Sequence, residues 1–169
     1  MVFNSLYFAV FFLAFLGLYR LLPHRGQNGL LVAAGYAFYA TWDWRFPGLL
    51  VVSTLTAYAC GVLLGRLDDE RRRRLVLAAG LGVHLALLGF FKYFGFFAEN
   101  LRALLGLAGL RADGFTLQVL LPVGVSFYTF VAMSYVIDVY RRQTRPCRSL
   151  VGVAACIGFF PTLLSGPIV

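Results

Sequence analysis

Unbroken runs of apolar residues constrain this chain more than any other feature of its sequence. Charged residues separate six of them: Phe3–Leu22, Leu30–Trp42, Phe46–Gly65, Leu75–Phe91, Leu117–Tyr140 and Leu150–Val169. Backbone polar groups in lipid have to be satisfied within their own segment, which favours helices, whereas a membrane β-barrel needs strands that alternate apolar and polar positions. The sequence therefore predicts an all-α fold, a polytopic transmembrane helical protein of about six apolar segments in a single domain.

The lengths of the runs separate full spans from uncertain ones. A helix needs about 20 residues to cross a bilayer, and the first, third, fifth and sixth runs reach that length. Leu30–Trp42 is shorter, and it could cross a thinned region, extend back through Asn28 or be re-entrant. The fourth run could continue through Lys92–Phe97. Residues 99–116 predict a short amphipathic helix at the outer interface, because their leucines are spaced for one face.

The composition agrees with a lipid environment. Hydrophobic residues make up 60% of the 169 residues and charged residues only 13%, and the mean hydropathy is +0.80. A soluble domain of this size could not bury so much apolar surface. The net charge of +8 is explained by a basic rim beside anionic lipid, so the lipid bilayer is the expected partner and nucleic acid is not.

The distribution of basic residues predicts the orientation. Eleven of them lie in the first, third and fifth connections between the runs, and four lie in the second and fourth. Cytoplasmic loops retain Lys and Arg, so we expect the N-terminus outside and the RLDDERRRR loop, residues 66–74, inside. MVFNSLYFAVFF at the start has no positive region and no A-x-A site follows it, so it does not predict a cleavable signal.

Side chains typical of soluble enzymes are scarce. GVSFY at 124–128 begins like a nucleophile elbow but has Tyr128 where the second glycine belongs. Ser126, His84 and Asp138 could be imagined as a triad, but the predicted topology places them at different depths. The sequence shows no metal-ligand spacing and no phosphate-binding glycine loop, so neither a metal nor a cofactor is expected. Without a C-x-x-C motif, packing roles are expected for the three cysteines: Cys60, Cys147 and Cys156.

Two ionisable residues in the apolar runs need separate interpretations. An ionisable group within a span is a functional candidate by default, but His84 is more simply a neutral imidazole that hydrogen-bonds a neighbouring helix. Asp138 precedes Arg141 and Arg142 by three and four residues, which predicts a helix-end salt bridge at the inner rim. The alternative for Asp138 is a role in shaping a path through the membrane.

Small residues and a proline predict local packing. GVLLG, residues 61–65, fits the small-xxx-small pattern of close helix contacts. Pro122 sits where a helix can begin without losing a needed hydrogen bond, so the helix that ends at Tyr140 is expected to start there.

Several motifs in fixed order carry a family resemblance. They are MVFNSLYF at 1–8, GYAFYATWDWRF at 35–46, FFKYFGFF at 90–97, LLPVGVSFYTF and SYVIDVYR within 120–141, and FFPTLLSGPIV at 159–169. Together they resemble the membrane-bound O-acyltransferase family, most of all its bacterial branch with the alginate O-acetyltransferase membrane subunit. The resemblance covers almost the whole chain.

The resemblance implies transfer of an acyl group, expected to be acetyl, to hydroxyls of an extracytoplasmic polysaccharide such as alginate. It also implies a multi-pass protein of the bacterial inner membrane and partner proteins that supply the acyl donor or act in periplasmic acetylation. Peptidoglycan and teichoic acid receiving D-alanine are other acceptors that fit. A non-catalytic membrane scaffold and a transporter or channel remain the alternative function classes, the latter because Pro161, Gly166 and Pro167 interrupt the last run.

This chain departs from the family pattern at two places. Ala57 stands before Tyr58 where the branch usually has an aspartate. The near-invariant histidine of the family lies in a Trp/Gly-rich motif that residues 1–169 do not contain, and neither His24 nor His84 matches it. The resemblance therefore assigns no catalytic residue. It predicts that residues 1–169 are the N-terminal part of a single acyltransferase domain, inactive when isolated.

Overall fold

The computed structural model describes residues 6–41, 43–107, 124–159 and 161, and every regular element within these ranges is a helix. The helices are α1 (Leu6–Leu21), α2 (His24–Ala40), α3 (Phe46–Arg66), α4 (Glu70–Leu107), α5 (Val125–Tyr140) and α6 (Leu150–Ile157). The predicted all-α fold is confirmed for the described residues.

The boundaries of the first three helices follow from local sequence. α2 begins at His24, directly after Pro23 in an extended conformation. The short second run therefore extends back beyond Asn28, one of its three predicted alternatives, while Trp42 lies outside the described residues. α3 has a proline in its first turn, where no backbone donor is lost, and it matches the predicted run to within one residue.

α4 differs most from its prediction. It has 38 residues and continues without interruption to Leu107, so a separate amphipathic helix starting at residue 99 was wrong for residues 99–107. Residues 108–116 of that prediction lie outside the described residues. The physical reason is that no proline lies between Glu70 and Leu107, and the glycines in this stretch are individually tolerated in a helix.

The last two helices are shorter than their apolar runs. α5 begins at Val125, after Gly124 with a φ of 77°, and the predicted start at Pro122 lies outside the described residues. α6 has eight residues, its N-cap Ser149 accepts a hydrogen bond from the Gly152 N–H, and it ends at Gly158. Residues 162–169, the end of the sixth run, are also outside the described residues.

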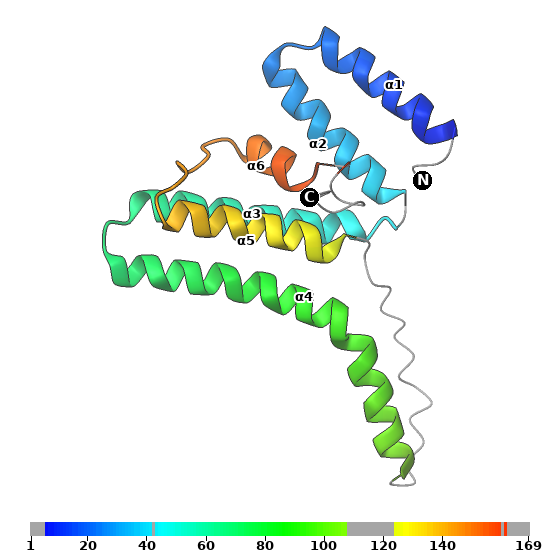
Figure 1. Cartoon of the computed structure of the whole chain (residues 1–169), viewed down its shortest axis with the longest axis vertical. Coiled ribbons are helices and arrows are strands. Elements are labelled where there is room, and N and C mark those ends of the chain that lie inside the picture. The colour runs from blue at the N-terminus through cyan, green and yellow to red at the C-terminus, as the bar shows by residue number, and fades with distance from the viewer. Residues whose placement is uncertain (1–5, 42, 108–123, 160, 162–169) are drawn as a thin grey trace.

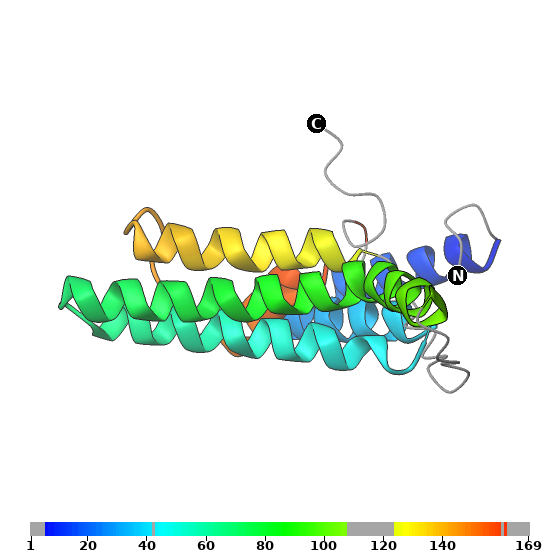
Figure 2. The same ribbon diagram turned by 90° about the horizontal axis from the view of Figure 1, so that it is seen from below.

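Three helices form the centre of the molecule. α3, α4 and α5 lie side by side, with α4 antiparallel to the other two (Figures 1 and 2). α2 and α6 pack against α3, and α1 packs against α2. Leu50, Ala57, Ala132 and Val136 are completely buried in the core that these contacts form. The second half of α4 turns away from the bundle (Figure 1).

The outer faces of the helices are apolar. Large side chains such as Leu13, Leu85 and Phe90 are more than half exposed. Two helical stretches are long and apolar enough to cross a membrane: α3 (Phe46–Arg66) and the Glu70–Tyr93 part of α4. Val10–Leu21 of α1 and Val125–Tyr140, which is α5, are shorter apolar stretches. An apolar exterior around a small core indicates that the chain is a membrane protein.

Candidate functional site

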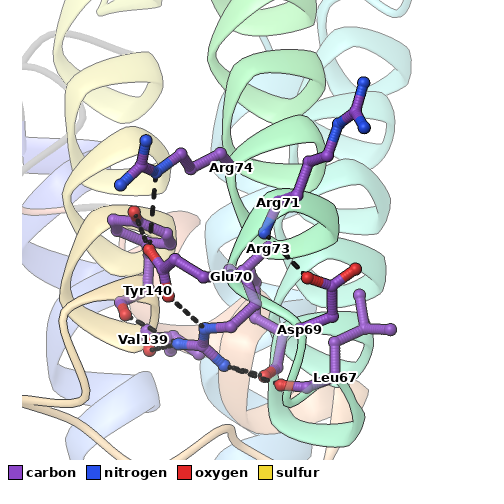
Figure 3. A network of polar contacts seen from close by, with 9 residues as sticks. Leu67, Asp69, Glu70, Arg71, Arg73, Arg74, Val139 and Tyr140 are labelled. Carbon is purple, nitrogen blue, oxygen red and sulfur yellow. Dashed lines mark hydrogen bonds and ion pairs between the residues drawn. The ribbon is translucent and has the colours of Figure 1, made fainter.

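A buried arginine ties two helix ends together (Figure 3). Arg73, in the first turn of α4, is only 4% exposed. Its Nη1 donates to the carbonyl oxygens of Leu64 at 2.5 Å and Leu67 at 3.1 Å. Its Nη2 donates to those of Tyr140 at 2.7 Å and Val139 at 3.5 Å. One guanidinium thus satisfies carbonyls at the C-terminal ends of both α3 and α5.

Electrostatics favour this arrangement. α3 and α5 run in the same direction, so the negative ends of their dipoles meet at one place, and a buried cation there is stabilised. Glu70 lies 3.9 Å from Arg73 and 3.6 Å from Arg74, and it accepts a hydrogen bond from the Tyr140 hydroxyl. The Arg73 guanidinium also lies 5.6 Å from the centre of the Tyr140 ring. These contacts join α3, α4 and α5 at the end of the bundle that carries residues 66–74 and 141–148. We call it the arginine-rich end.

The interior of the bundle holds a second polar contact. His84 is completely buried. Its Nδ1 lies 2.7 Å from the Gly80 carbonyl oxygen, and its Nε2 lies 3.1 Å from the Ser53 hydroxyl. A neutral imidazole with its proton on Nδ1 satisfies both contacts, because the carbonyl can only accept and the hydroxyl can donate to Nε2. The predicted hydrogen bond from His84 to a neighbouring helix is confirmed.

The imagined triad does not form. In the described part of the chain, no hydrogen bond connects Ser126, His84 and Asp138, and the hydroxyl beside His84 is that of Ser53. The His84 nitrogens are both engaged in structural contacts. The arrangement therefore provides no activated nucleophile.

The predicted salt bridge of Asp138 was wrong. Across the described residues, the Asp138 carboxylate makes no ion pair within 4.0 Å. The reason is the way α5 ends: Gln143 N–H donates to the Asp138 carbonyl and Arg142 N–H to that of Val139, with Arg142 at a φ of 61°. This Schellman turn takes Arg142 out of the helical register on which the predicted pair with Asp138 depended.

The GVLLG segment packs closely, as predicted. A Cβ atom placed on Gly61 would lie 2.6 Å from the Tyr135 hydroxyl oxygen, and one on Gly65 would lie 2.5 Å from Cγ of Pro146. Gly80 of α4 similarly faces the sulfur of Cys60, where a Cβ would lie at 2.7 Å. Only glycine fits these positions without displacing a neighbour, which confirms the close helix contacts.

A cleft of about 740 Å³ opens at the arginine-rich end, between α3 and the connection from α5 to α6. Its lining includes Tyr58 and Val62 of α3 and three arginines. The arginines are exposed, and no carboxylate of the described chain lies within 4.0 Å of their guanidinium nitrogens: Arg66, Arg145 and Arg148. The cleft is suited to binding an anion.

The three cysteines are free thiols, with Cys60 buried, Cys147 partly exposed and Cys156 exposed. Within the described residues, no three His, Cys, Asp or Glu side chains gather as metal ligands. Ala57 is completely buried. The branch that this chain resembles usually carries an aspartate at this position. This chain instead places a methyl group there, in the core of the bundle.

Sequence analysis missed the roles of Arg73 and of the cleft. A signal for Arg73 exists in the spacing 73, 80, 84, which places the arginine on the same helical face as Gly80 and His84. All three of these residues are buried. The cleft has no such signal, because its arginines come from two segments about 80 residues apart.

Comparison with known proteins shows what the chain is similar to. The chain is 43% identical to the probable alginate O-acetylase AlgI of Pseudomonas putida, over 99% of this chain and 35% of that protein. The protein of the same name from Azotobacter vinelandii is 42% identical, over 99% of this chain and 34% of that protein. Almost the whole of this chain is thus similar to about a third of the alginate O-acetylases. The predicted resemblance to membrane-bound O-acyltransferases is thereby confirmed.

A second kind of relative belongs to the same comparison. The peptidoglycan O-acetyltransferase of Helicobacter pylori is 30% identical, over the whole of this chain and 37% of that protein. The chain spans about a third of the length of the curated relatives it matches. No family model matches the chain, and no solved structure matches it.

Proposed function

We propose that this chain serves membrane O-acetylation, in which an acetyl group passes to hydroxyls of an extracytoplasmic polysaccharide such as alginate. The observation that carries this proposal is the identity of about 40% to alginate O-acetylases across 99% of the chain. The Helicobacter pylori relative makes peptidoglycan a second candidate acceptor. Partner proteins that deliver the acyl donor or act in the periplasm belong to the same proposal.

The described residues have a supporting role in this reaction. Acyl transfer to a hydroxyl needs a base within hydrogen-bond reach of the acceptor. His84 is buried with both ring nitrogens engaged, so it is not placed for that task. We therefore assign to α2–α6 the positioning of helices around the reaction path, and we place the catalytic base outside the residues that the structure describes.

The proposal includes a multi-pass arrangement in the bacterial inner membrane with the N-terminus outside. Two observations support it: successive helices alternate in direction, and the connections at 67–69 and 141–149 lie at the same end of the bundle (Figure 1). Arginines concentrate near these connections, as expected for a cytoplasmic side. The domain formed by residues 1–169 would be the N-terminal part of the acyltransferase domain.

The orientation can be tested by thiol accessibility. In a variant whose three cysteines are replaced by serine, a single cysteine at Asp43 should react with an impermeant thiol reagent in intact cells. One at Asp69 should react only after the membrane is opened. Both positions are in connections between helices, and neither is buried: Asp43 is partly exposed and Asp69 is exposed. The opposite labelling pattern would reverse the orientation.

The activity can be tested with a chimera. Residues 1–169 would replace the matching third of the Pseudomonas putida relative, and membranes would be assayed for transfer of labelled acetyl groups to alginate. We expect polymer labelling well above that of a vector control. Membranes with residues 1–169 alone should give no labelling. A chimera that inserts and folds but labels neither alginate nor peptidoglycan would argue for a scaffold instead.

A further inference from the structure

The cleft at the arginine-rich end is preformed. Its arginine-bearing segment, residues 145–148, is held at two points, since the Tyr58 hydroxyl donates to the Arg148 carbonyl at 3.2 Å and the Cys147 N–H donates to the Tyr135 hydroxyl at 3.0 Å. Pro146 between them packs directly on Gly65. The segment therefore presents its arginines from a fixed backbone, which reduces the ordering cost of binding.

Among the described residues, no carboxylate forms an ion pair with the arginines of this cleft. Arg66, Arg145 and Arg148 line it together, whereas the ion-paired arginines of this end, such as Arg72 and Arg74, lie on α4 beside their carboxylates. Asp68 lines the adjoining hollow rather than this cleft. Guanidinium groups match the geometry of phosphate oxygens and bind them through paired hydrogen bonds.

The α3 side of the cleft also carries apolar surface. Val62 lines it, and Leu55, seven residues earlier on α3, lies on the same helical face and is 47% exposed. The cleft thus joins a cationic pocket to an exposed apolar strip. A soluble phosphate would use only the pocket, whereas a phospholipid would use both parts.

We propose that this cleft binds the phosphate of an anionic phospholipid, whose acyl chains lie along the face of α3 that carries Leu55 and Val62. The inference rests on the proposed membrane insertion of this end and does not depend on acetyl transfer. It assigns a lipid site to three arginines that the acetylation reaction leaves without a role.

The test measures lipid affinity directly. The full chain, purified in detergent, would be titrated with phosphatidylglycerol or phosphatidylcholine, and bound lipid would be counted by native mass spectrometry. We expect a clear preference for phosphatidylglycerol. The variant R66Q/R145Q/R148Q should lose that affinity on the order of 100-fold, at roughly fivefold for each arginine. R66K/R145K/R148K should lose less than about tenfold, because the charges remain.

A matched control separates a defined site from general charge. R20Q/R71Q/R141Q removes the same charge from exposed arginines that do not line the cleft, and it should change the affinity by less than about threefold. Equal losses in the two glutamine variants, or no preference between the lipids, would overturn the proposal. Complete displacement of the lipid by millimolar inorganic phosphate would assign the cleft to a soluble phosphate instead. Circular dichroism should show the same helix content in all variants, and acetyl transfer by the chimera is scored separately.

Discussion

Replacing Arg73 should destabilise the bundle more than replacing any other arginine of the 71–74 run. In Arg73→Met, the side chain keeps most of the volume of the arginine stem but loses all its donors. Three carbonyl oxygens at 2.5, 2.7 and 3.1 Å, in buried or partly buried contacts, then lose a charged partner. Hydrogen bonds to charged groups contribute about 1.5–3 kcal/mol each, and the cost of burying the guanidinium offsets part of their sum. We expect a loss of about 4 kcal/mol.

The assay is equilibrium or thermal unfolding of the purified chain in detergent, where about 4 kcal/mol corresponds to a melting temperature lower by roughly 10 °C. Arg73→Lys should give an intermediate loss, because one ammonium group cannot reach carbonyls of both helices in the same fork geometry. Arg72→Met is the matched control: that side chain is 72% exposed and pairs only with an exposed carboxylate, so its loss should stay below about 0.5 kcal/mol. Equal stability of the Arg73 and Arg72 variants would refute the role of Arg73.

Three further substitutions test the helix contacts. Gly61→Ala should cost about 1–3 kcal/mol in unfolding free energy, because its Cβ would lie 2.6 Å from the Tyr135 hydroxyl, whereas Gly17→Ala, in open space, should cost nothing. His84→Ala should lower stability by about 3 kcal/mol through a cavity and a lost hydrogen bond, while labelled acetyl transfer per folded chimera stays unchanged; lost transfer in a fully folded variant would make His84 catalytic. Asp138→Asn should change the unfolding free energy by less than about 0.5 kcal/mol, since no ion pair is broken, and a loss above 2 kcal/mol would contradict the structure.

Periodicity and small residues made much of the bundle predictable. Three features depend on one helical face, which a sequence displays directly. They are the bounds of α3, the contact of His84 with a neighbouring helix and the close contacts of the GVLLG segment. The end of α4 was not predictable in this way, because nothing in residues 92–107 distinguishes a continuing helix from a new one. The similarity to alginate O-acetylases was predictable for a different reason, since several motifs keep their order along the chain.

Contacts at helix ends were harder to predict than contacts along helices. Four consecutive arginines look alike in the sequence, and only the meeting of two distant helix ends makes Arg73 different from its neighbours. The pair expected for Asp138 failed for a related reason, because Arg142 adopts a left-handed conformation that is uncommon outside glycine. The cleft likewise requires knowledge of which segments meet in space.

The contact of Arg73 with α3 and α5 also determines how the bundle can move. It fixes the first turn of α4 and so acts as a pivot, with the remainder of the helix as a lever. Tyr93 lies about 30 Å further along α4, so a rotation of about 5° at the pivot moves it by roughly 3 Å while the arginine contacts shift far less. The space between α4 and its neighbours is therefore expected to widen at the end remote from Arg73, where α4 already turns away from the other helices (Figure 1).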